Sequence, residues 1–61
     1  MYQITVEWLD DTCDAIGKPE SRKADAIRLA RFMARGAIKG LARRYMVERD
    51  GVAVASFAVE G

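Results

Sequence analysis

Hydrophobic and polar residues alternate at the start of the chain, over residues 2–9. The hydrophobic positions share one parity, and they are Tyr2, Ile4, Val6 and Trp8. Gln3, Thr5 and Glu7 occupy the other parity. A period of two, with β-branched and aromatic residues, predicts a strand that buries one face.

The spacing of the hydrophobic residues then becomes helical. One face of the predicted helix holds Ala26, Ile27, Ala30, Met33 and Ala34, with Leu29 less central. This pattern predicts an amphipathic helix of about four turns. The helix is expected to begin near Pro19, with Ser21 as the other candidate for the N-cap, and to end at Gly36 in a left-handed C-terminal cap. Residues 10–19 contain turn-forming and helix-breaking residues, so they are predicted to form a loop.

Residues 41–59 return to a strand pattern that is interrupted by Asp50-Gly51. This dipeptide favours a two-residue hairpin of type I′, which would pair Arg49 with Val52 and Val47 with Val54. One face of this hairpin would then hold Tyr45, Val47, Val52, Val54 and Ala58. The other would hold Arg44, Met46, Glu48, Ala53, Ala55, Phe57 and Val59. A β-bulge would shift this register.

Together these elements predict a single α+β domain over residues 1–61, with the order β-α-β-β. Residues 52–59 carry no charge, as is usual for a central strand. Placing them in the middle gives a three-stranded antiparallel sheet in the order 1-3-2, with short connections and one helix packed on one face. The opposite face would be uncovered, and exposed apolar surface of this kind commonly marks an interface. The residues expected there are Arg44, Met46, Ala55, Phe57 and Val59, and the partner is expected to be a second copy or another protein.

Charge is distributed unevenly along the chain, although the net charge is only +1. Residues 22–49 contain nine of the ten basic residues and two acidic ones, which gives this segment a charge of +7. Within it, Arg28, Arg31 and Arg35 share the outer face of the predicted helix, and Lys39 extends the series. Arginine suits phosphate and carboxylate groups, so this basic face is a candidate binding surface. A solvated helix face explains the same pattern equally well.

Several kinds of chemistry find no support in the sequence. There is no His, and Cys13 is the only cysteine, so neither a zinc site nor an internal disulfide is expected. Asp10, Asp11 and Asp14 are interpreted as turn and capping residues, because their spacing misses the calcium-loop pattern. No cofactor, metal, catalytic residue or small-molecule substrate is therefore predicted.

The short apolar runs predict no membrane segment and a cytoplasmic location. The small size is in keeping with a phage or mobile-element protein.

These observations predict a small, non-enzymatic binding protein, similar to an inhibitor or adaptor in its mode of action. It would engage a macromolecule through the basic helix face, the uncovered sheet face, or both. Two alternatives stay open: binding of nucleic-acid phosphates by Arg28, Arg31 and Arg35, and a purely structural role in oligomerisation.

Overall fold

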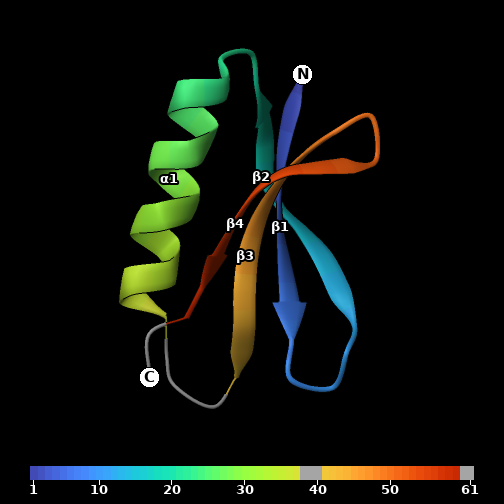
Figure 1. Cartoon of the computed structure of the whole chain (residues 1–61), viewed down its shortest axis with the longest axis vertical. Helices are drawn as coiled ribbons and strands as arrows, with labels where there is room; N and C mark the ends of the chain where they lie inside the picture. Colours follow the sequence, from blue (N-terminus) through green and yellow to red (C-terminus); the bar gives the residue numbers. More distant parts are fainter. Residues whose placement is uncertain (38–40, 60–61) are drawn as a thin grey trace.

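The computed structural model describes residues 1–37 and 41–59, which form one helix and four strands (Figure 1). The elements in chain order are β1 (Tyr2–Trp8), β2 (Cys13–Glu20), α1 (Lys23–Gly36), β3 (Ala42–Arg49) and β4 (Val52–Ala58). The predicted α+β class, with one helix and an antiparallel sheet, is confirmed. Within the described residues, the helix is too short and too polar to cross a membrane.

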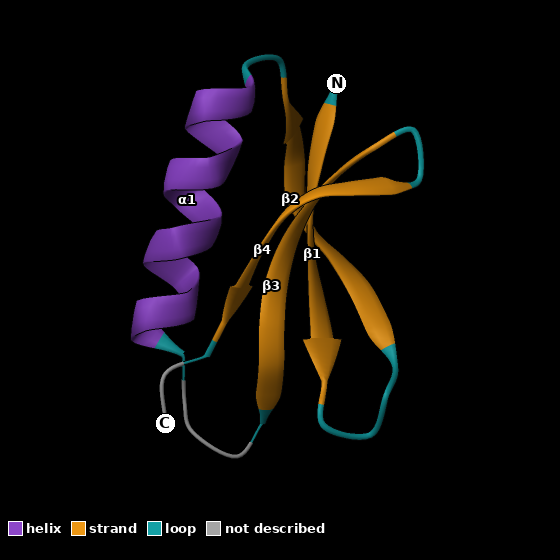
Figure 2. Ribbon diagram, viewed as in Figure 1, coloured by secondary structure: helices purple, strands orange, loops and turns teal. Residues whose placement is uncertain are grey.

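The four strands form one antiparallel sheet in the order β2-β1-β3-β4, and α1 lies along one side of it (Figure 2). The helix contacts all four strands, and β3 most extensively. The core lies between these two layers. Its fully buried side chains include Ile4 and Val47, which pair across β1 and β3. Ala26 and Ala30 pack on them from the helix. The strand predicted at residues 2–9 and its buried parity are thus confirmed.

Strand β2 is the main difference from the prediction, which made residues 10–19 a loop. Gly17 and Pro19, the two residues that suggested a loop, both lie within β2. They are tolerated because β2 is at the edge of the sheet, where Pro removes no needed donor. A bulge between the pairs Tyr2–Glu20 and Ile4–Ile16 also accommodates Gly17, whose φ is +70°. The side-chain amide of Gln3 donates to the Ile16 carbonyl at 3.0 Å and so stabilises this irregular region.

The predicted strand order 1-3-2 is wrong for the same reason. The additional strand reverses the chain before the helix, so β3 returns antiparallel to β1 and pairs with it directly. Strand β4, which was predicted to be central, therefore lies at the outer edge of the sheet. The sequence run without charges belongs to an edge strand.

The hairpin turn is as predicted, but its register is not. Asp50 and Gly51 have φ values of +53° and +80°, as a type I′ turn requires, and Arg49 pairs with Val52. A bulge then occurs between the pairs Glu48–Ala53 and Val47–Ala55. This bulge moves the rest of β4 by one residue, and a shift of one exchanges the two faces.

The helix begins later than predicted, at Lys23 and not near Pro19. Arg22 precedes it in an extended conformation and makes no side-chain hydrogen bond to the helix N-terminus. Gly36 is the last helical residue, and Ala37 follows with φ of −69°, so the left-handed cap predicted at Gly36 is absent. The predicted buried face is correct: Ala26, Ala30 and Ala34 are its buried members.

Candidate functional site: the groove between α1 and β4

A groove separates the helix from the outer strand. It encloses a hollow of about 410 Å³, and its lining residues are Arg31, Ala34, Arg35, Ser56, Phe57 and Ala58. Its floor is Phe57, which packs against the core on the helix side of the sheet. The guanidinium carbon of Arg31 lies 5.3 Å from the centre of the Phe57 ring. This distance is within the range of a cation–π contact, so Arg31 is held over the groove.

The shape of the groove follows from the residues on both sides. Ala34 is small and buried, so the helix sits close to the sheet at this point. Arg31 and Arg35 lie one turn apart and both border the groove. The bulge in β4 places Phe57 beneath them, opposite Tyr45 of β3. Without this bulge the helix side of β4 would carry Ser56 at that position.

Arg31 and Arg35 differ from most other arginines in their ion pairing. Within residues 1–37 and 41–59, the ion pairs are Arg28–Asp25, Arg43–Asp11, Arg44–Glu7 and Arg49–Asp50. Neither groove arginine takes part in one of these pairs. The groove therefore presents two positive charges beside an apolar floor, and it is suited to a ligand with negative charge.

The predicted basic series on the helix is only partly assembled. Arg28 lies on the outer surface and is 3.8 Å from the Asp25 carboxylate. Beside it, Leu29 and the 73% exposed Phe32 form an apolar area on the outer surface of the helix. Lys39 lies outside the described residues. The structure thus brings Arg31 and Arg35 together at the groove, whereas Arg28 is not among the residues that line it.

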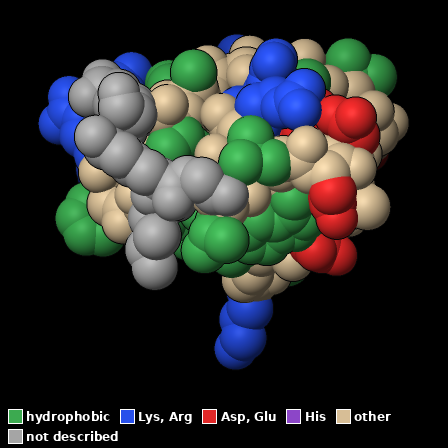
Figure 3. Space-filling model, turned by 90° about the horizontal axis from the view of Figure 1, so that it is seen from below, with side chains coloured by type: hydrophobic (Ala, Val, Ile, Leu, Met, Phe, Trp, Pro, Cys, Tyr) green, Lys and Arg blue, Asp and Glu red, His purple; other side chains and the backbone are tan. Residues whose placement is uncertain are grey.

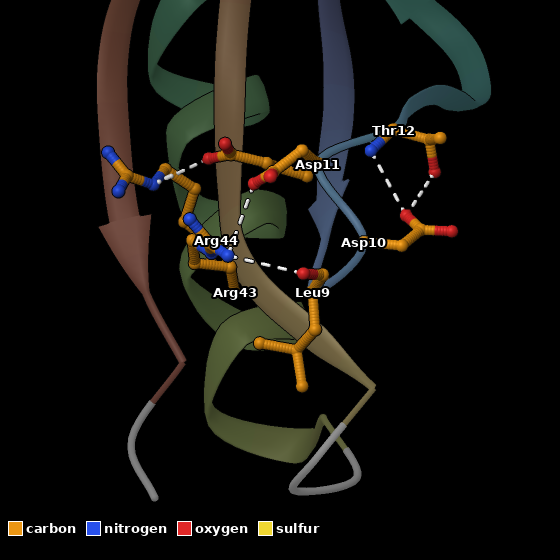
Figure 4. Close-up of polar contacts among 7 residues, drawn as sticks. Leu9, Asp10, Asp11, Thr12, Arg43 and Arg44 are labelled. Atoms are coloured by element: carbon orange, nitrogen blue, oxygen red, sulfur yellow. Dashed lines mark hydrogen bonds and ion pairs between the residues drawn. The ribbon is translucent and has the colours of Figure 1, made fainter.

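Two other arginines of the basic segment form polar contacts with β1 and the β1–β2 turn (Figure 4). Arg43 contacts the Asp11 carboxylate and donates to the Leu9 carbonyl, both at 3.2 Å. Arg44 lies 2.8 Å from the Glu7 carboxylate on the neighbouring strand. Two of the nine basic residues in this segment therefore contact acidic side chains of the same chain.

The β1–β2 turn also contains a hydrogen-bonded pair, Asp10 and Thr12. The Thr12 hydroxyl donates to the Asp10 carboxylate at 2.6 Å, and the Thr12 backbone N–H donates to the same oxygen at 3.0 Å. These hydrogen bonds favour the charged form and lower the pKa of Asp10. Asp10 is therefore a turn residue, as predicted, whereas Asp14 lies in β2 and accepts a hydrogen bond from the Trp8 indole N–H at 2.6 Å, so its predicted turn or capping role is wrong. Among the residues that the structure describes, no cluster of acidic or cysteine side chains could hold a metal ion.

The predicted sheet-face set does not share one face. Arg44 and Met46 lie on the uncovered face, whereas the bulge turns Ala55 and Phe57 toward the helix. Val59 follows β4, is half-buried, and donates its backbone N–H to Arg43 at 3.1 Å. The prediction that Phe57 lies on the uncovered face is wrong. On the uncovered face, Glu7 and Arg44 form an ion pair between neighbouring strands.

A further hollow of about 280 Å³ lies at the end of the molecule near the start of β3. It is lined mainly by apolar residues, including Trp8, Leu41 and Tyr45. Viewed from this end, hydrophobic side chains lie in the middle and acidic ones gather at one side (Figure 3). Two of its lining residues, Ala37 and Leu41, flank residues 38–40 in the sequence, which lie outside the described part of the chain, whereas the groove is lined by described residues.

Sequence reasoning missed the outer edge of β4, which borders the groove. Residues 52–59 carry no charge, a pattern that predicts a central strand, whereas β4 lies at the edge of the sheet. Comparison with models of protein families, with curated proteins and with solved structures finds no match to this chain. Geometry and charge are therefore the evidence for its function.

Proposed function

We propose that this protein is a small, non-enzymatic binding module that holds an acidic partner protein in the groove between α1 and β4. The observation that carries the proposal is the placement of Arg31 and Arg35 beside Phe57, outside the described ion pairs. Guanidinium groups over an apolar floor bind carboxylates well, because the site offers both charge and burial. An inhibitor or adaptor would act through such a contact.

A protein partner is favoured over nucleic acid by the arrangement of the charges. Nucleic-acid binding by Arg28, Arg31 and Arg35 needs a row of cations that can follow successive phosphates. Arg28 is instead turned to Asp25 on the outer surface, next to the apolar Leu29 and Phe32. Two arginines at one groove suit a local pair of carboxylates better than a phosphate backbone.

The proposal is tested by purifying the tagged protein from the cells that naturally make it, with and without nuclease treatment. The double variant Arg31→Glu/Arg35→Glu should lose a stoichiometric protein partner that the wild type retains after nuclease. The control, Arg22→Glu/Lys23→Glu, makes the same change in net charge at the other end of the helix and should retain the partner. A partner released by nuclease, or lost equally from both variants, would overturn the proposal in favour of nucleic acid or of non-specific charge.

A further inference from the structure

The two edges of the sheet are built differently. The edge strand β2 contains Lys18, Pro19 and a bulge, which are features that prevent another strand from pairing with an edge. The edge strand β4 has no charged residue and no proline from Val52 to Ala58. Its bulge is at Val54, near the hairpin turn, and the residues beyond it are regular. One edge is thus protected, and the other is suited to pairing.

The backbone groups available on β4 can be identified from its pairing with β3. The N–H of Val59 donates to the carbonyl of Arg43, so Val59 and every second residue back to the bulge at Val54 bond inward to β3. Phe57 and Ala55 belong to this inward set. The N–H and C=O groups of Ser56 and Ala58 therefore point away from the sheet, along the groove that these residues line.

We propose that β4 accepts an extended acidic segment of the partner protein as a fifth, antiparallel strand, with alternate carboxylates reaching Arg31 and Arg35. This proposal rests on the proposed function and specifies the chemistry of the partner. Residues opposite Ser56 and Ala58 exchange backbone hydrogen bonds with them. Residues opposite Phe57 place their side chains on the helix side of the sheet, beside the two arginines.

Charge complementarity selects this occupant over a second copy of the chain. Symmetric pairing of two β4 strands would place both helices on the same face of a joined sheet. The Arg31 and Arg35 side chains of the two copies would then border one continuous depression. The described part of β4 contributes no carboxylate to offset them. An acidic strand satisfies the same backbone edge and neutralises both arginines.

The probe for the test is a capped ten-residue peptide in which glutamate alternates with threonine, labelled for fluorescence anisotropy. The matched peptide alternates glutamate with proline: it has the same charge but lacks the N–H groups that would face β4. The glutamate–threonine peptide should bind at least about tenfold more tightly than the glutamate–proline peptide. A lysine–threonine peptide should not bind.

The two sheet edges supply matched variants of the protein. Ser56→Pro removes an outward N–H from β4 and should weaken binding about tenfold. Ala15→Pro removes an outward N–H from β2, because the Trp8–Thr12 hydrogen bond gives Ala15 the outward parity on that strand. It should leave the affinity within about twofold. Arg31→Glu/Arg35→Glu should abolish binding.

Amide hydrogen exchange of the wild-type chain gives a second result that does not depend on any variant folding. The Ser56 and Ala58 amides should become protected only when the peptide is bound, and the Ala15 amide should stay exchangeable. Equal binding of the two acidic peptides without this protection would overturn strand addition while leaving the acidic partner of the proposed function intact. Absence of binding, or protection of Ser56 that rises with protein concentration alone, would also overturn it, the latter by assigning the edge to a second copy.

Discussion

At the scale of single residues, Thr5 has a buried hydroxyl group that lacks a hydrogen-bond partner within the described residues. It is 8% exposed, and within the described residues its Oγ1 atom has no hydrogen-bond partner. Thr5 lies in the middle of the uncovered sheet face, between Ala15 of β2 and Met46 of β3. Neighbouring side chains shield it from water, although no helix covers this face. A buried hydroxyl without a partner costs free energy.

Thr5→Val should therefore raise the free energy of unfolding by about 1 kcal/mol, because valine keeps the shape and removes the unpaired oxygen. Urea unfolding followed by circular dichroism measures the effect. Thr12→Val provides the contrast, since the Thr12 hydroxyl donates to Asp10 and its loss should lower stability. A Thr5→Val variant no more stable than the wild type would contradict the interpretation and indicate that Oγ1 is hydrogen-bonded in solution.

At the scale of the elements, the N-terminus of α1 lacks a side-chain cap. Arg22 occupies the N-cap position, where its positive charge is also unfavourable to the helix dipole. Arg22→Ser should raise the free energy of unfolding by about 1 kcal/mol relative to Arg22→Ala. The two variants make the same change in charge and differ in the hydroxyl that can accept from the first turn. Thermal unfolding compares them, and equal midpoints would show that serine does not cap this helix.

The helix and strands differ in how well the sequence pattern predicts them. Strand β1 and the buried alanine face of α1 were predictable, because each buries one side and so has a regular hydrophobic period. Strand β2 has no such period: most of its residues are exposed, and it contains Gly17 and Pro19. It exists because the edge of β1 is available for pairing, which is a tertiary effect that local propensity does not report.

The candidate site was predictable to a smaller extent. The helical period predicts Arg31 and Arg35 on the polar side of the helix, and both line the groove together with Phe57. The face of Phe57 depends on a single bulge at Val54, whose presence the sequence pattern does not indicate. The pairing of Arg28 with Asp25, three residues earlier, had a signal in the sequence in the form of their spacing.

At the scale of the whole molecule, one helix on a four-stranded sheet makes the edges as important as the faces. Because β2 occupies one edge of the sheet and β3 pairs directly with β1, the uncharged strand β4 lies at the other edge. The absence of charge in β4 has a different meaning there than in the centre of a sheet. In the centre it reflects burial, whereas at an edge it leaves the backbone open to a partner.

The distance between the two layers depends on the row of Ala26, Ala30 and Ala34, of which the first two are completely buried. Ala30→Leu forces a larger side chain against Ile4 and Val47 and should lower the free energy of unfolding by about 1–3 kcal/mol. Ala24→Leu, at an exposed position of the same helix, should change it by less than about 0.5 kcal/mol. Chemical denaturation measures both effects.

Ala30→Leu also tests whether packing in the core affects the shape of the groove. Arg31 follows Ala30 directly, so moving the helix away from the sheet also moves the Arg31 guanidinium away from the Phe57 ring. Ala30→Leu should therefore change the ring-proton chemical shifts of Phe57, while Ala24→Leu should leave them unchanged. Unaltered Phe57 shifts in a destabilised Ala30→Leu variant would show that the groove keeps its shape independently of the alanine row, and that the two layers do not set its width.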